Sequence, residues 1–181
     1  MKFFKKRALQ QLEKPLYLNA NLIYSEALNS IKKQEWKREI KSGTLTKLKT
    51  EGFSLVTSIL TRMEVIQRLC REENLSLEKA RETYNSILNE QKIMEITSIE
   101  NHTPLNDAFI DQIAASNLDF KDALHLQIAK KLGIPVCTHD KKERENFSQH
   151  PEKSKFYDSV FKPQELIKPK DQVRESDFQE Y

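Results

Sequence analysis

One stretch of the chain, residues 122–140, constrains the fold more than any other part of the sequence. A helical pattern begins at Asp122, stops at a Gly-Ile-Pro segment at residues 133–135, and gives way to a short apolar run that ends before Asp140. Glycine suits the position just after a helix, and proline blocks its continuation. A helix that leads into a buried strand is typical of an α/β fold. In a parallel sheet, an acid at a helix start and an acid at a strand end can converge at the edge where such folds bind ligands.

The composition favours one globular domain with a large core. The chain has 181 residues, of which 38% are hydrophobic and 31% are charged, so disorder is not expected. Only three glycines are present, which favours helices over tight hairpins. The net charge of +3 is nearly balanced and does not by itself predict nucleic-acid binding. The two cysteines, Cys70 and Cys137, show no paired spacing and are predicted to be buried thiols in a reducing compartment.

Neither end of the sequence nor its apolar runs suggest a membrane protein. No apolar run approaches the roughly 18 residues of a membrane span. The first residues are basic and lack the apolar centre of a signal peptide. We therefore expect a soluble, cytoplasmic protein with no membrane partner.

Alternating apolar and helical segments predict an α/β domain with a central, largely parallel sheet flanked by helices. The predicted strands lie at residues 15–19, 54–57, 93–99, 136–138 and 154–161. Helices are predicted from about residue 20, after Ser58, after Ser76, over 104–115, and from Asp122 to Gly133, with the two serines as N-caps. We expect a basic N-terminal arm at 1–14, a single domain at 15–168 and a polar tail at 169–181.

Three acidic residues are candidate ligands for a divalent cation. Mg²⁺ prefers hard oxygen ligands and usually takes one or two carboxylates. Asp122, Asp140 and Glu64 could supply them, together with the residue that ends the first strand. Each acid also has an ordinary explanation. The aspartate at 122 could cap its helix, unless Asp119 is the actual cap; the one at 140 could be a turn residue or pair with the lysines that follow it.

Glu64 could belong to a capping box with Thr61, although Ser58 is the better cap and would place this glutamate further into the helix. For His125 and His139, packing or surface roles are favoured over metal ligation, because neither has a second histidine at helical spacing. Three cations beside Asp140 could contact RNA phosphates or be simply solvated. They are Lys141, Lys142 and Arg144.

Taken in order, these segments resemble a PIN-domain ribonuclease, with the VapC-type toxins the most similar subgroup. The family pattern has an apolar strand ending in Asp-(Ser/Thr)-Asn, a helix with Ser-x-x-(Thr)-x-x-Glu, a later Asp-Ala, and a strand ending in Thr-x-Asp. The corresponding segments here are Leu18-Asn19-Ala20-Asn21, Ser58-Ile-Leu-Thr61-Arg-Met-Glu64, Asp122-Ala123 with Ala129, and Thr138-His139-Asp140. The resemblance covers about residues 15–168.

The resemblance implies an endoribonuclease that uses Mg²⁺ or Mn²⁺. Glu64, Asp122 and Asp140 would be acidic metal ligands, with Asn21 and Thr138 supporting the site. Asn19 stands where the family has its first aspartate, and Ala20 replaces the usual small hydroxyl residue. An amide oxygen can coordinate a cation but brings no charge, so cation binding and electrostatic stabilisation of the transition state should be weaker.

Three explanations of Asn19 remain open: an inactivating substitution, a natural member of low activity, or a protein that binds RNA without cutting it. A VapC-type toxin would imply a cognate antitoxin and a homodimer. The alternatives are a non-catalytic RNA-binding or protein-interaction module on the same fold, and an RNA-maturation nuclease.

Overall fold

The computed structural model describes residues 12–32, 43–97, 119–139 and 160–167, and every structural statement below concerns these ranges. Their elements, in chain order, are β1 (Pro15–Leu18), α2 (Ala20–Lys32), α3 (Thr44–Thr50), β2 (Ser54–Ser58), α4 (Ile59–Glu72), α5 (Leu77–Glu90), β3 (Met94–Ile96), α7 (Phe120–Leu132), β4 (Val136–Cys137), β5 (Val160–Phe161) and α10 (Pro163–Leu166).

The strands form a five-stranded, all-parallel sheet in the order β3-β2-β1-β4-β5. The first strand of the chain lies in the centre, where Tyr17 is aligned with Val56 of β2 on one side and with Val136 of β4 on the other. Because all the strands are parallel, their carboxyl ends meet at one edge of the sheet. The predicted α/β class and parallel sheet are confirmed.

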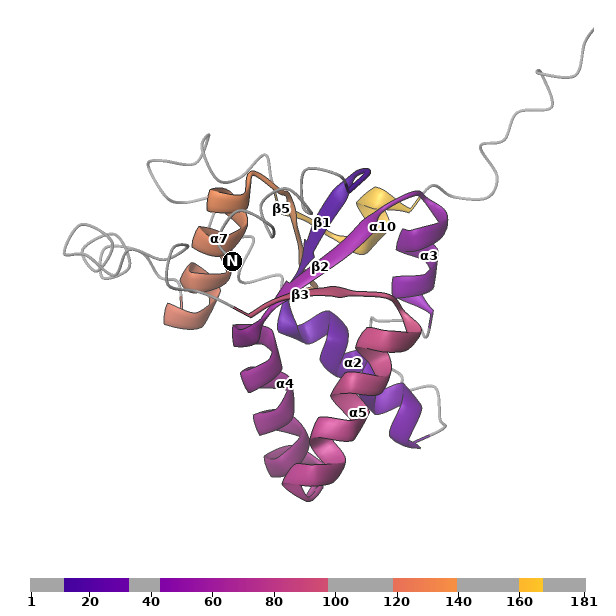
Figure 1. Cartoon of the computed structure of the whole chain (residues 1–181), viewed down its shortest axis with the longest axis vertical. Helices are drawn as coiled ribbons and strands as arrows, with labels where there is room; N and C mark the ends of the chain where they lie inside the picture. The colour runs from indigo at the N-terminus through magenta and orange to yellow at the C-terminus, as the bar shows by residue number, and fades with distance from the viewer. Residues whose placement is uncertain (1–11, 33–42, 98–118, 140–159, 168–181) are drawn as a thin grey trace, which may run out of the picture.

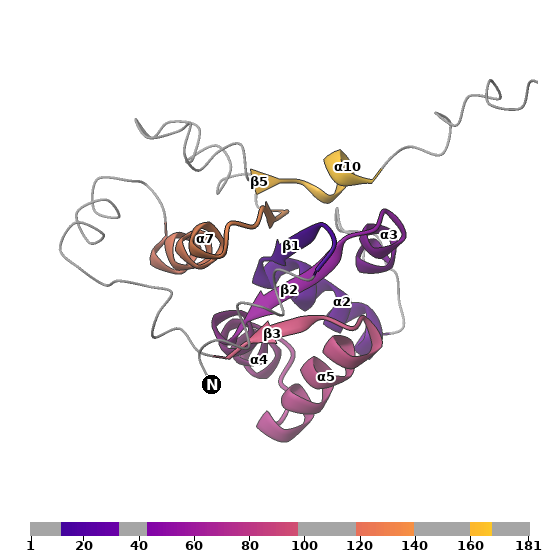
Figure 2. The same ribbon diagram turned by 45° about the horizontal axis from the view of Figure 1, so that its top comes forward.

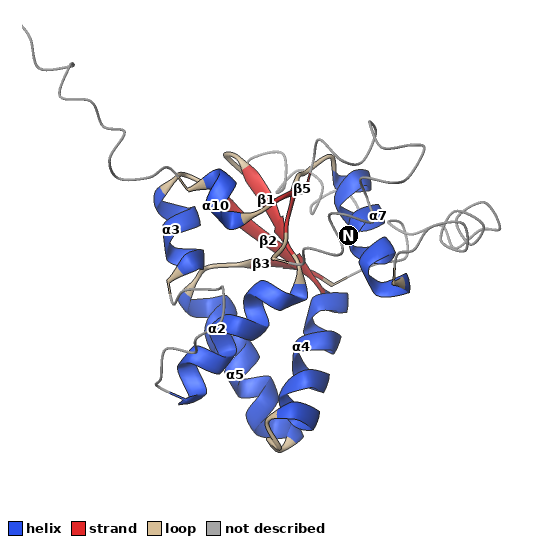
Figure 3. Cartoon of the chain, turned by 180° about the vertical axis from the view of Figure 1, so that it is seen from behind, coloured by secondary structure: helices blue, strands red, loops and turns tan. Residues whose placement is uncertain are grey.

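Helices cover both faces of the sheet. In the central strand, Leu16 and Leu18 belong to one apolar cluster, which includes residues of α2, α4 and α5, whereas Tyr17 belongs to a second cluster with Leu126 and Ile128 of α7. This alternation follows from the two-residue period of a strand. Accordingly, α7 stands apart from the group formed by α2, α4 and α5 (Figures 1 and 2). Figure 3 shows the strands enclosed between the helices.

Several element boundaries differ from the sequence prediction. The third strand is confined to Met94–Ile96, shorter than expected at its start. Helix α3 was not predicted as a separate element; its N-cap is Gly43, which has a left-handed φ of 81°. The helix predicted at 104–115 lies outside the described residues, as does most of the strand predicted at 154–161.

Helix α7 begins at Phe120, two residues earlier than predicted, because Asp119 is its N-cap and accepts a hydrogen bond from the backbone N–H of Lys121 at 2.8 Å. Its end is as expected: Gly133 has a φ of 68°, a left-handed conformation that glycine adopts at low cost. Asp122 therefore lies in the first turn of the helix and does not cap it.

A buried carboxylate joins β3 to the two helices that pack beside it. Glu95 accepts hydrogen bonds from the Arg62 guanidinium of α4 and from the Tyr84 hydroxyl of α5, the latter at 2.9 Å. Burial and the neighbouring Glu95 raise the pKa of the Tyr84 hydroxyl. This three-residue contact fixes an edge strand that has only three residues of its own.

Candidate functional site

Polar side chains follow the strands at the carboxyl edge of the sheet. Asn19 comes directly after β1, is 4% exposed, and its backbone N–H donates to the carbonyl of Cys137 in β4 at 3.1 Å. Thr138 comes directly after β4, and its backbone N–H donates to the carbonyl of Phe161 in β5 at 3.0 Å. The ladder of the sheet thus continues through both residues and fixes their backbones at this edge.

Asn21 links the two strand ends. Its Nδ2 donates to Oγ1 of Thr138 at 3.0 Å, and its Oδ1 accepts from the backbone N–H of His139 at 3.4 Å. The residue lies in the first turn of α2, where the chain leaves the central strand. The family resemblance predicts Asn21 and Thr138 together as supports of the site, and in the structure their side chains are in contact.

Glu64 lies in the second turn of α4, which starts immediately after β2. Ser58 is the N-cap by position, so the capping-box explanation with Thr61 does not apply. The Glu64 side chain is 16% exposed, and its Oε1 lies 3.1 Å from Nε2 of His125 in α7. This contact joins helices from opposite faces of the sheet at its carboxyl edge.

His125 is completely buried and makes a hydrogen bond through each ring nitrogen. Its Nδ1 lies 2.7 Å from the hydroxyl of Tyr17, which in turn lies 2.7 Å from Oγ of Ser58. The Ser58 hydroxyl makes no helix-capping hydrogen bond and is used in this contact instead. The sequence prediction of a packing or surface role missed the link to Glu64. One signal was present, since His125 follows Asp122 by three residues and so shares its helix face.

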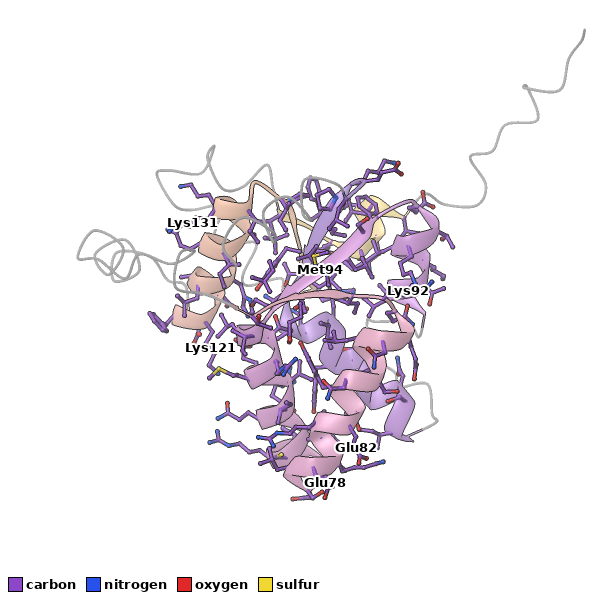
Figure 4. All side chains as sticks on the ribbon, in the orientation of Figure 1. Glu78, Glu82, Lys92, Met94, Lys121 and Lys131 are labelled. Atoms are coloured by element: carbon purple, nitrogen blue, oxygen red, sulfur yellow. The ribbon has the colours of Figure 1, made fainter. Side chains whose placement is uncertain are left out.

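Asp122 lies one turn before His125 on α7. Because Asp119 already caps the helix, the capping explanation for Asp122 is removed. Its carboxylate still interacts favourably with the helix dipole in the first turn. Helix α7 therefore directs Asp122 and His125 along one face, and the histidine reaches Glu64. Figure 4 shows Lys121, an exposed neighbour of Asp122 that sequence analysis did not single out, where α7 approaches α4.

Asp140, Lys141, Lys142 and Arg144 lie outside the described residues, so their predicted roles stay predictions. Within the described ranges, no three His, Cys, Asp or Glu side chains come together closely enough to hold a metal ion. The donors that this edge does supply are the carboxylates of Glu64 and Asp122 and the amide of Asn19. These hard oxygens suit Mg²⁺ or Mn²⁺, which keep several waters when the protein supplies few ligands. These oxygen donors are of the kind that such a cation binds. At residue 19, however, the chain supplies a neutral amide and not a carboxylate.

A family model for the PIN domain matches residues 36–149, more than half of the chain. The chain belongs to the PIN domain family. The matched region contains Glu64, Asp122, Thr138 and Asp140, whereas Asn19 precedes it. No curated protein matches the chain.

PIN domains are generally metal-dependent nucleases, and the all-parallel sheet with helices on both faces agrees with this membership. The strand β1 lies before the matched region, yet it forms the centre of the sheet. Among the described residues, no helix is long and apolar enough to cross a membrane.

Proposed function

We propose that this PIN domain is an endoribonuclease that depends on Mg²⁺ or Mn²⁺ and whose activity is reduced by Asn19. The observation that carries the proposal is the contact between Glu64 and His125, one turn from Asp122. It brings a glutamate of α4 and the first turn of α7 to the carboxyl edge of the sheet, the edge where open α/β folds bind ligands.

Glu64 and Asp122 would hold the cation, with Asp140 as the third acid and Asn19 as a neutral oxygen donor. A bound divalent cation supplies activation of a water molecule and stabilisation of charge on the phosphate. Asn21 and Thr138 would keep the strand ends in place around the substrate. Lys141, Lys142 and Arg144 are proposed to bind RNA phosphates, and Lys121 could serve the same purpose from the start of α7.

The test is Mn²⁺-dependent cleavage of a mixed RNA pool by the unmodified chain and by its Asn19→Asp variant. We expect the aspartate variant to cleave faster, because a fourth carboxylate strengthens cation binding. Asp122→Asn in the Asn19→Asp background should abolish cleavage. Asp119→Asn is the matched control: it lies three residues earlier, keeps an efficient N-cap residue, and should leave cleavage unchanged.

The family subgroup is a finer part of the proposal. A VapC-type toxin would act as a homodimer and be inhibited by a cognate antitoxin. Sedimentation would give the oligomeric state, and growth arrest on expression of Asn19→Asp, relieved by a neighbouring open reading frame, would support a toxin. An RNA-maturation nuclease would instead cut defined precursor RNAs without arresting growth.

Asn19 favours a second candidate, a PIN domain that binds RNA without cutting it. An amide at this buried position contributes no negative charge toward a cation. If Asn19→Asp binds the RNA pool but cleaves none of it in Mn²⁺, the binding module replaces the nuclease as the better description.

A further inference from the structure

A continuous row of hydrogen bonds between side chains runs from two strands of the sheet to His125 of α7 and ends on Glu64 of α4. It passes from Ser58 Oγ to the Tyr17 hydroxyl at 2.7 Å, on to Nδ1 of His125 at 2.7 Å, and from Nε2 to Oε1 of Glu64 at 3.1 Å. The first three residues are completely buried, whereas the Glu64 side chain is 16% exposed. The row thus connects the protein interior to an acid that solvent can reach.

The two ends of this row, Ser58 and Glu64, give it a direction. Within the described part of the chain, Tyr17 is the one hydrogen-bond partner of the Ser58 hydroxyl, so the serine proton has the tyrosine oxygen as its acceptor. A buried hydroxyl that donates to nothing is costly. At the other end of the row, an ionised carboxylate only accepts hydrogen bonds, so Nε2 of His125 is the donor to Oε1 of Glu64, and in a neutral ring Nδ1 is then the acceptor for the Tyr17 hydroxyl. A neutral imidazole with Nδ1 as acceptor carries its proton on Nε2 and donates it to Glu64.

We propose that His125 is a positioning residue for Glu64, held by Tyr17 and Ser58 as the neutral Nε2–H tautomer. The N–H of His125 holds Oε1 of Glu64 and leaves Oε2 available to a divalent cation. Hydrogen bonds behind a ligand orient it and tune its basicity, which is why their loss weakens metal binding. The inference rests on the proposed function, since it assigns the groups that hold one of the proposed cation ligands in place.

The first test needs no metal and begins with the unmodified chain. In ¹⁵N-labelled, metal-free protein at neutral pH, we expect the His125 ring to show a pyridine-type resonance for Nδ1 and a pyrrole-type resonance for Nε2. Tyr17→Phe removes the donor to Nδ1 and should mix the two tautomers. Tyr84→Phe is the matched control, because it removes another buried tyrosine hydroxyl, one that donates its hydrogen bond to the Glu95 carboxylate and not to a member of this row.

The second test measures Mn²⁺ binding calorimetrically in the Asn19→Asp background. His125→Leu should raise the dissociation constant about 10- to 100-fold, the usual effect of losing a group that orients a metal ligand. His125→Gln should recover most of the affinity, since its amide nitrogen lies the same number of bonds from the backbone as Nε2. Tyr17→Phe should raise the constant about three- to tenfold, the effect of one buried hydrogen bond, and Tyr84→Phe should not change it.

A proton on Nδ1, or on both ring nitrogens, would overturn the proposal, as would equal Mn²⁺ affinities for the leucine and glutamine variants. If His125→Leu does not fold, the tautomer of the unmodified chain and the Tyr17→Phe variant still decide the matter. Failure of the proposed nuclease is distinguishable, because it would appear as absent RNA cleavage by Asn19→Asp while the ring tautomer stays as described.

Discussion

The side chain of Asn21 donates to Oγ1 of Thr138 across 3.0 Å and accepts from the next backbone N–H, so a single amide joins the start of α2 to the end of β4. These two residues are more than a hundred positions apart in the chain. Together with the backbone bond from Asn19 to Cys137, this contact holds the ends of β1 and β4 together beside the candidate cation donors.

Replacing Asn21 with alanine should therefore destabilise the fold. Two partly buried hydrogen bonds are lost, and we expect the free energy of unfolding to fall by about 1–2 kcal/mol. Urea denaturation of the variant and the parent measures the difference. Asn29→Ala, on the same helix, is the control: Nδ2 of Asn29 has no hydrogen-bond partner among the described residues, so its removal should cost less than about 0.5 kcal/mol. Equal losses would contradict the role given to Asn21.

The ion pair at Glu95 makes a second prediction about stability. Arg62→Met removes the cation that pairs with the Glu95 carboxylate, whose side chain is only 7% exposed. Loss of one partner from a fully buried ion pair is strongly destabilising. Because the arginine side chain is itself 37% exposed, water offsets part of the loss, and we expect about 1–3 kcal/mol.

Thermal or urea denaturation would measure this loss against Lys79→Met. Lys79 pairs with Glu82 on the surface of α5, and removing that pair should cost less than about 0.5 kcal/mol. A loss for Arg62→Met no larger than that of Lys79→Met would show that the Glu95 contact does not stabilise β3.

Glu26 of α2 predicts a pH dependence. Burial raises the pKa of its carboxyl, while a hydrogen bond from the Gly43 backbone N–H opposes the rise. Because the pKa is raised above 4.5 in the folded state, the folded protein keeps this proton at pH values where the unfolded chain has already lost it. The stability of the fold therefore falls as the pH rises from 4.5 through the folded-state pKa. Oε2 of Glu26 is also buried without a hydrogen-bond partner among the described residues.

Glu26→Gln should thus raise the free energy of unfolding at pH 7 by up to about 1 kcal/mol. The neutral amide carries no charge at this partly exposed position, so the cost of burying a carboxylate is removed. The gain should disappear below pH 4.5, where the parent carboxyl is protonated in both states. Denaturation curves at several pH values test this. The exposed Glu78→Gln on α5 removes the same charge and should show no such pH-dependent gain (Figure 4). A gain that persists at low pH would have another cause.

The two cysteines should differ sharply in reactivity. Cys137 is completely buried in β4, and burial raises the pKa of its thiol. Since the thiolate is the reactive form, iodoacetamide should modify the partly exposed Cys70 first in the native protein. Mass spectrometry of the labelled peptides gives both rates. Comparable native-state rates would mean that β4 opens readily from the sheet.

The fold class could be predicted from the sequence because its signals are local. An apolar strand, a helix with an N-cap and a Gly-Ile-Pro stop can each be recognised within about ten residues. Helix α3 escaped because its run, Thr44–Thr50, is too short for a helical period to stand out. The start of α7 was misplaced because Asp119 and Asp122 are both suitable caps, and only the backbone shows which one is used.

The sequence predicts acids for the candidate site but not the residues that surround them. Glu64 and Asp122 were singled out because they recur in a family pattern, and their role as metal ligands stays a prediction. The row through Tyr17, Ser58 and His125 joins residues more than a hundred positions apart, and each of the three looks ordinary in its own segment. From the sequence, a tyrosine in an apolar strand is predicted to be a core residue, and a serine before a helix is predicted to be its N-cap.

The central position of β1 has a consequence for the order of folding. Its partner β2 follows about forty residues after β1, whereas its other partner, β4, follows more than a hundred residues after β1. On the ribosome, β1, β2 and β3 can therefore pair long before α7 and β4 emerge. Until then, the edge of β1 that pairs with β4 stays unpaired. Asn19 and Glu64 are synthesised early, whereas Asp122 and Thr138 arrive late. We expect the candidate site at this edge to be completed last, when the late-synthesised residues reach those already in place.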